Sequence, residues 1–175
     1  MKKIRRQSSA EKESSIKKKL VCLLILFVSL GSQGQSLFEL GSKLSEMKMS
    51  GDSTVKEEAK RIESLVYDLH PMVYIDKGTE KVFGESNPVR VCVDASSVNN
   101  LKENIPLFNS IELITIRLEN ESDLNFVLDL SDLKAFKNLK YVNFIYCFES
   151  KPEDISTLYI PKPGISVFYH NSVPE

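Results

Sequence analysis

Two histidines and three cysteines are the side chains of this 175-residue chain best suited to nucleophilic or acid–base chemistry. Two of them, Cys147 and His170, end consecutive predicted strands at the same position. In a parallel sheet they would lie about 5 Å apart, close enough for a thiol nucleophile and an imidazole base. Glu119, the neighbouring carboxylate in the pattern, would lie on the far side of the cysteine strand and could not orient the imidazole. We therefore expect no catalytic residue in this row.

The same row does not have the geometry of a metal site. Asp94, Glu119, Cys147 and His170 would extend over about 14 Å, whereas metal ligands converge to within roughly 2.3 Å of one point. Cys92 and Cys147 would be about 10 Å apart, beyond the roughly 7 Å reach of a disulfide, so we expect both to stay reduced. The chain contains no C-x-x-C, H-E-x-x-H, G-x-S-x-G or P-loop motif. We expect neither a metal nor another cofactor.

The polar faces of the predicted strands have a chemistry suited to protein binding. Two arginines stand beside apolar side chains, a combination that is enriched at interaction surfaces. We predict a partner-binding face made of Arg90, Thr115, Arg117, Asn143, Ile145, Ser166 and Phe168. The alternative, that a further element or a second copy of the chain covers this face, stays open.

Four segments with alternating residues would position these side chains. One face of every segment is apolar or aromatic, with Val91, Ile116, Phe144 and Val167 at the centres, and the other face is mostly polar. A period of two with one apolar face indicates a single sheet that is buried on one side and solvated on the other. The predicted strands are Val89–Asp94, Ile114–Glu119, Val142–Cys147 and Ile165–His170.

The lengths of the connectors predict how consecutive strands are joined. The connectors run about 15–20 residues, too long for tight hairpins and long enough for parallel crossovers. Each connector carries a helix signal, at residues 97–105, 131–136 and 152–158. One strand–loop–helix unit cannot bury its own apolar face, so neighbouring units must stack. We predict an α/β fold with a short, solenoid-like parallel sheet of such repeats; an α+β fold with a mixed sheet is the alternative.

One of these units resembles a known repeat family. Residues 139–147, LKYVNFIYC, fit the pattern L-x-x-L-x-L-x-x-N/C in full, and the other strands keep parts of it. The chain therefore resembles leucine-rich-repeat proteins over residues 86–170. The resemblance implies that Cys147 turns inward as a structural residue. It also implies that the exposed strand face is a concave, partner-binding surface without catalysis.

The N-terminal residues 1–35 are typical of a signal peptide. A basic stretch up to Lys19 precedes the apolar residues 20–30, and small residues follow. Eleven apolar residues in a helix cover about 17 Å, whereas a bilayer core needs roughly 30 Å. We expect export to the periplasm, the envelope or the medium, with cleavage near Gly34 or Gln35. An uncleaved anchor is the alternative, and membrane contact would then involve this segment alone.

A predicted helix and hairpin precede the repeats. Thr54 and Glu57 form a capping box before an apolar stripe, and the helix ends before Pro71 with His70 as a C-terminal cation. Two short strands then flank a turn at Gly78. We assign residues 36–53 to a flexible lead-in, 54–88 to a helix and hairpin that cap the repeats, and 89–175 to the repeat region of the same domain.

The charge distribution argues against nucleic acid as a partner. Residues 1–35 carry eight Lys or Arg and two Asp or Glu, a balance of +6, whereas the remainder carries 15 and 22, a balance of −7. The sequence therefore predicts an exported, non-catalytic interaction module that binds a protein or envelope partner through the exposed strand face. An envelope hydrolase or transferase and a self-assembling scaffold are the alternatives.

Overall fold

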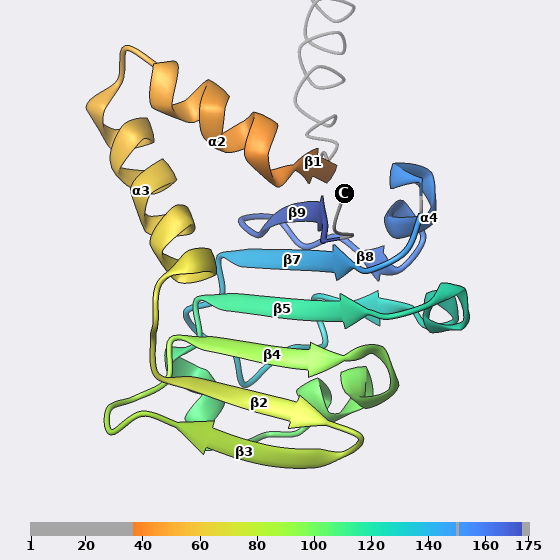
Figure 1. Ribbon diagram of the computed structural model, residues 1–175. Coiled ribbons are helices and arrows are strands. Elements are labelled where there is room, and N and C mark those ends of the chain that lie inside the picture. The colour runs from red at the N-terminus through yellow and green to blue at the C-terminus, as the bar shows by residue number, and fades with distance from the viewer. Residues whose placement is uncertain (1–36, 150, 173–175) are drawn as a thin grey trace, which may run out of the picture. The chain divides into compact units, whose positions relative to one another are not determined.

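The computed structural model describes residues 37–149 and 151–172, so the predicted signal peptide at residues 1–35 lies outside the described residues. The described chain is mixed α/β, built on an open seven-stranded sheet with the strand order β1-β9-β7-β5-β4-β2-β3 (Figure 1). Every neighbouring pair in this sheet is parallel except β2 and β3. The strands are β1 (Leu37–Glu39), β2 (Met72–Asp76), β3 (Thr79–Phe83), β4 (Arg90–Asp94), β5 (Leu113–Leu118), β7 (Tyr141–Tyr146) and β9 (Ser166–Asn171).

The four predicted strands are confirmed as β4, β5, β7 and β9, each displaced by no more than one residue at either end. They are consecutive neighbours and all parallel, as the connector lengths predict. Because side chains alternate along a strand, each predicted apolar residue also lies on the expected face. Val91, Ile114, Val142 and Val167 form one fully buried row across this face, which we call the first face.

The main hydrophobic core lies between the first face and the connectors. Residues such as Val98, Leu101, Phe108 and Ile155 pack there against the strands. The connector helices are short, and most are 3-10 helices: η1 (Ala95–Lys102), η2 (Pro106–Ser110), η3 (Glu121–Leu124) and α4 (Pro152–Ser156). The helix expected at residues 131–136 is absent, because this segment of the described chain is a series of turns.

Two connectors also pair with each other in a second, smaller sheet. Strand β6 (Leu128–Asp129) follows β5, β8 (Tyr159–Ile160) follows β7, and they form a parallel two-stranded sheet. The buried side chains of Leu128 and Tyr159 face each other across this pair. The connectors are thus joined by backbone hydrogen bonds as well as by side-chain packing.

The opposite side of the sheet, the second face, is partly covered by two helices. Helix α2 (Leu40–Met49) lies where a flexible lead-in was expected, and α3 (Ser53–Tyr67) follows it after a short turn (Figure 1). Leu40, Leu44, Ala59, Ile62 and Leu65 of these helices are buried in a second hydrophobic cluster with side chains of β5, β7 and β9. The helices therefore cover part of a sheet face and do not cap the end of the repeats.

Helix α3 starts slightly earlier than the capping box at Thr54 predicts. Its N-cap is Asp52, whose carboxylate accepts a hydrogen bond from the Thr54 amide at 2.8 Å. An aspartate N-cap two residues earlier satisfies an amide group of the first turn and also places a negative charge at the helix N-terminus. The helix ends at Tyr67, and His70 Nε2 lies 3.1 Å from the Ser64 carbonyl oxygen in the last turn.

The predicted hairpin is confirmed as β2 and β3, with full pairing from Met72–Phe83 to Asp76–Thr79. Its two-residue turn has positive φ at both Lys77 (49°) and Gly78 (74°), as in a type I′ turn. The hairpin extends the sheet beyond β4, and all five residues of β3 are exposed at this edge. β3 therefore forms one edge of the sheet and β1 the other.

Candidate functional site

The register of the sheet differs from the predicted alignment by two residues at the outer strands. Val91 of β4 and Val167 of β9 are level with Ile114 and Val142, not with Ile116 and Phe144. A shift of two residues keeps every side chain on its predicted face but changes its neighbours. The rows on the second face are Arg90–Leu113–Tyr141–Ser166, Cys92–Thr115–Asn143–Phe168 and Asp94–Arg117–Ile145–His170.

Three residues of the predicted binding face are buried. Thr115, Asn143 and Phe168 expose 3 %, 0 % and 3 % of their surface. Phe168 belongs to the cluster under α2 and α3, with ring contacts to Phe38 and Tyr141. The expectation that these side chains are open to a partner is wrong, and for Phe168 the cause is the helical cover of the second face.

Arg90 holds α3 onto the sheet. Its Nη1 donates to the carbonyl oxygens of Leu65 at 3.0 Å and Val66 at 3.3 Å, and also lies 3.4 Å from that of Asp68. These carbonyls belong to the last turn of the helix and its C-cap, where a cation also interacts favourably with the helix dipole. Arg90 was predicted as a binding residue, and the structure gives its guanidinium an internal partner instead.

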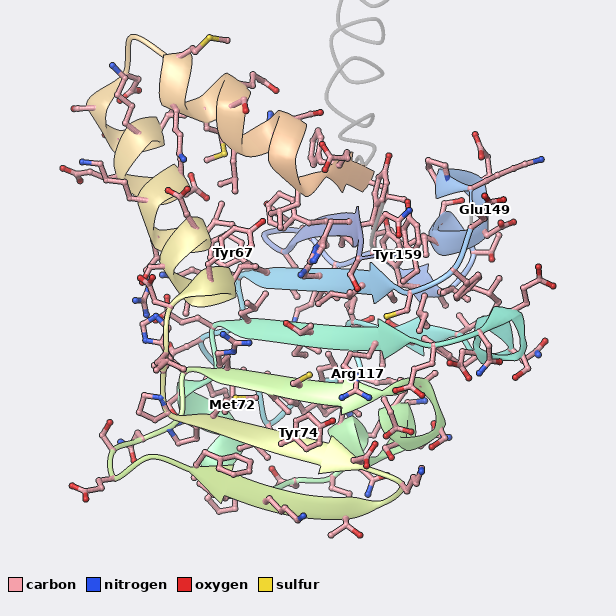
Figure 2. All side chains as sticks on the ribbon, viewed as in Figure 1. Tyr67, Met72, Tyr74, Arg117, Glu149 and Tyr159 are labelled. Carbon is pink, nitrogen blue, oxygen red and sulfur yellow. The ribbon has the colours of Figure 1, made fainter. Side chains whose placement is uncertain are left out.

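Arg117 and Ile145 lie side by side on the part of the second face that the helices leave uncovered. They are paired across β5 and β7, and both are partly exposed. Figure 2 shows Arg117 together with Tyr74 of β2 on this face, in front of the strands and away from α2 and α3. Of the seven predicted residues, these two keep the expected position on an accessible surface, and Ser166 lies at the edge of a pocket considered below.

The guanidinium of Arg117 is held in one orientation by two neighbours. It donates to the Tyr74 hydroxyl and to the Glu119 carboxylate, and it lies over the Tyr74 ring with 5.4 Å between Cζ and the ring centroid. Although burial opposes the charge, the contacts with Glu119 and Tyr74 raise the pKa of Arg117 above its ordinary value. The side chain remains 28 % exposed, so a fixed cation is presented to solvent.

Tyr74 and His170 belong to this surface although they were not predicted for it. Tyr74 lies on the hairpin, which was interpreted as a cap, and its pairing with Cys92 places it on the second face. His170 is paired with Ile145, and its Nδ1 donates to Asn143 Oδ1 at 3.3 Å. Burial lowers the pKa of His170, and the nearby Glu39 carboxylate acts in the opposite direction. The alternation of β2 was the sequence signal that could have identified Tyr74.

Within the described residues, Cys147 does not lie beside the imidazole that was expected next to it. Cys147 is exposed and its Sγ lies 3.4 Å from the Ser172 hydroxyl, whereas His170 is level with Ile145, two residues earlier. The expected neighbouring position of Cys147 and His170 is therefore wrong, as is the inward orientation of Cys147. Cys92 and Cys147 are free thiols, and burial raises the pKa of Cys92.

Within residues 37–149 and 151–172, no three His, Cys, Asp or Glu side chains converge as metal ligands would. The same residues contain no helix that is long and apolar enough to cross a membrane. No protein-family model, curated protein or solved structure matches this chain.

Proposed function

We propose that this chain is an exported, non-catalytic interaction module whose partner is a protein with a basic surface. The binding surface that we propose, here called the open strip, consists of Tyr74, Arg117, Ile145 and His170. One observation carries the proposal: the helices cover only part of the second face, and Arg117 is held in a fixed orientation on the uncovered part.

The chemistry of the open strip supports protein binding. Arginine, tyrosine and aliphatic side chains are the usual anchors of protein interfaces. Because Arg117 already contacts Tyr74 and Glu119, binding would cost little of its side-chain entropy. A partner could cover Ile145 and bring an acceptor group to the guanidinium while its basic groups meet the surrounding acids.

The charge of the surroundings supports a basic partner. Residues 36–175 carry 15 basic and 22 acidic side chains, a balance of −7. Many of the acids end a strand of the main sheet or lie in the segment that follows one, at Asp76, Asp94, Glu119, Glu121, Asp123, Glu149, Glu153 and Asp154. A negative field of this kind accelerates the approach of a basic partner and weakens with salt.

We also propose that the chain is a divergent relative of the leucine-rich-repeat proteins. The supporting observations are the sequential parallel order of β4, β5, β7 and β9 and the pairing of connectors through β6 and β8. The proposal of export rests on the basic and apolar pattern of residues 1–35.

Site-specific cross-linking tests the binding surface. A photoreactive residue at Ile145 should capture a protein partner in native cells, and capture should be lost when Arg117→Glu is added. The control position is Val127, which is 57 % exposed and lies in the connector after β5. Yields at Ile145 should fall with added salt, because the partner is basic.

Two outcomes would contradict the proposal. A product of twice the chain's own mass would favour the self-assembling scaffold. Equal capture at Ile145 and Val127, or capture that Arg117→Glu does not reduce, would show that the open strip is not the binding surface.

A further inference from the structure

A pocket lies between α2, α3 and the edge of the sheet formed by β1 and β9. It has a volume of about 410 Å³, which falls within the usual range for small-molecule sites. Apolar side chains make up much of its wall: Phe38, Met47, Val55, Ile62 and Phe168. The two phenyl rings line the pocket with their planes tilted by 41° and their centroids 6.5 Å apart.

The charges at the rim favour a cation over an anion. Among the described residues that line the pocket, Lys43 is the one that is basic, and its Nζ lies 3.0 and 2.9 Å from the two carboxylate oxygens of Glu46. The same Nζ lies 4.6 Å from the centroid of the Phe38 ring. Its charge is therefore already balanced within α2. An anionic ligand would have to compete with Glu46 for this lysine.

Glu58 supplies the negative charge that lacks a cationic partner. Its Oε1 accepts a hydrogen bond of 3.3 Å from the Tyr141 hydroxyl, and it forms no salt bridge within the described part of the chain. Burial and the Glu58 carboxylate raise the pKa of Tyr141, so the phenol remains a neutral donor. Ser166, at the start of β9, adds a hydroxyl group to the pocket wall.

We propose that this pocket binds a small organic cation in which a primary ammonium group is joined to an aromatic or aliphatic body. The body lies against Phe38 and Phe168, and Glu58 balances the ammonium charge at the rim. The Ser166 hydroxyl provides a further acceptor. The site is independent of the open strip, with which it shares no residue, so either proposal can fail without the other.

Titration with matched probes tests this inference on the purified full-length chain. Phenethylammonium carries the ring and the cation, whereas phenylacetate has the same ring and an anionic group. Calorimetry or chemical-shift mapping should show saturable binding of phenethylammonium at the pocket and at least fivefold weaker binding of phenylacetate. Equal affinity for the two probes, or no saturable binding of phenethylammonium, would overturn the proposal.

Three variants separate charge recognition from a general loss of structure. Glu58→Gln keeps an acceptor for Tyr141 and should weaken phenethylammonium about fivefold, the size expected of a solvated ion pair. Glu57→Gln removes the adjacent, exposed carboxylate outside the pocket and should leave binding unchanged. Lys43→Met releases Glu46 and should strengthen binding about threefold.

The Lys43→Met variant tests the charge argument even if Glu58→Gln fails to fold. Tighter binding in Lys43→Met could not result from a damaged pocket. Unchanged affinity in Glu58→Gln, or an equal loss in Glu57→Gln and Glu58→Gln, would overturn the role of Glu58. Weaker binding of phenethylammonium in Lys43→Met would contradict the charge balance that we propose for the rim.

Discussion

Arg90 fixes the position of α3 through hydrogen bonds to the carbonyl groups of its last turn. Replacing it with alanine removes these bonds and leaves partly buried carbonyl oxygens without a donor. We expect Arg90→Ala to lower the free energy of unfolding by about 2 kcal/mol, the usual size for hydrogen bonds to a charged group. Urea denaturation measures this change. Lys60→Ala, an exposed change on the same helix, should alter stability little. Equal stability of the two variants would contradict the anchoring role.

His170 makes stability depend on pH in the weakly acidic range. Its pKa in the folded chain is lowered by burial, although Glu39 partly opposes this, so the unfolded chain binds the proton more readily. Stability is therefore present above the unfolded pKa of about 6.5 and is lost as the pH falls through the folded value. Denaturation at a series of pH values should show this loss, and His170→Gln should reduce the slope. An unchanged slope in the variant would assign the dependence to other groups.

Gly84 is required where the chain leaves β3. Its φ is +92°, and a Cβ at this position would lie 2.9 Å from the Pro71 Cα and Cβ atoms. We expect Gly84→Ala to destabilise the chain by about 2 kcal/mol or more, through strain at positive φ and this contact. Gly51, in the turn between α2 and α3, has open space around it. Gly51→Ala should therefore be neutral or slightly stabilising. A thermal melt of both variants checks the contrast, and equal melting temperatures would contradict it.

Glu112 joins α3 to the loop that leads into β5. Its carboxylate accepts from Arg61 of α3 at 2.5 Å and lies 3.3 Å from Lys140 Nζ, and these cations lower its pKa against the effect of burial. A double-mutant cycle with Arg61→Met and Glu112→Gln should give a coupling energy of about 1 kcal/mol. The pair is only partly buried, so a larger value is not expected. A coupling near zero would mean that apolar packing alone holds the helix.

The strands could be predicted because apolar and polar residues alternate along each over about six residues, a pattern that backbone geometry imposes directly. The register could not, since it depends on turns and crossovers whose lengths differ from unit to unit. The predicted second face also starts one residue too late, because the two central strands were predicted to begin at Ile114 and Val142, which lie on the first face. It therefore omits Leu113 and Tyr141, the two apolar side chains that α3 covers.

The helical cover was the main feature that the sequence analysis missed. Leu40, Leu44 and Met47 follow a helical spacing, but Gly41 and Gly51 favour an interrupted segment by local propensity. Packing against the sheet overrides that preference and forms α2. The predicted binding residues divide accordingly: Arg117 and Ile145 remain accessible, whereas Thr115, Asn143 and Phe168 are buried.

On the scale of the whole described chain, the sheet has two different sides. The connectors pack on the first face and form the main core with it. The two helices cover only the N-terminal half of the second face. The open strip and the pocket both result from this partial cover. The strip lies beyond the helices, and the pocket lies between the helices and the edge of the sheet.

Cysteine labelling tests this division of the second face most directly. In a chain whose three native cysteines are replaced by alanine, Leu113→Cys and Ile145→Cys place thiols on the same face of neighbouring strands. The account predicts fast alkylation at Ile145 and alkylation about a hundredfold slower at Leu113, since Leu113 reacts only when the helices open locally. Similar rates at the two positions would show that α2 and α3 do not cover the sheet and would contradict the account.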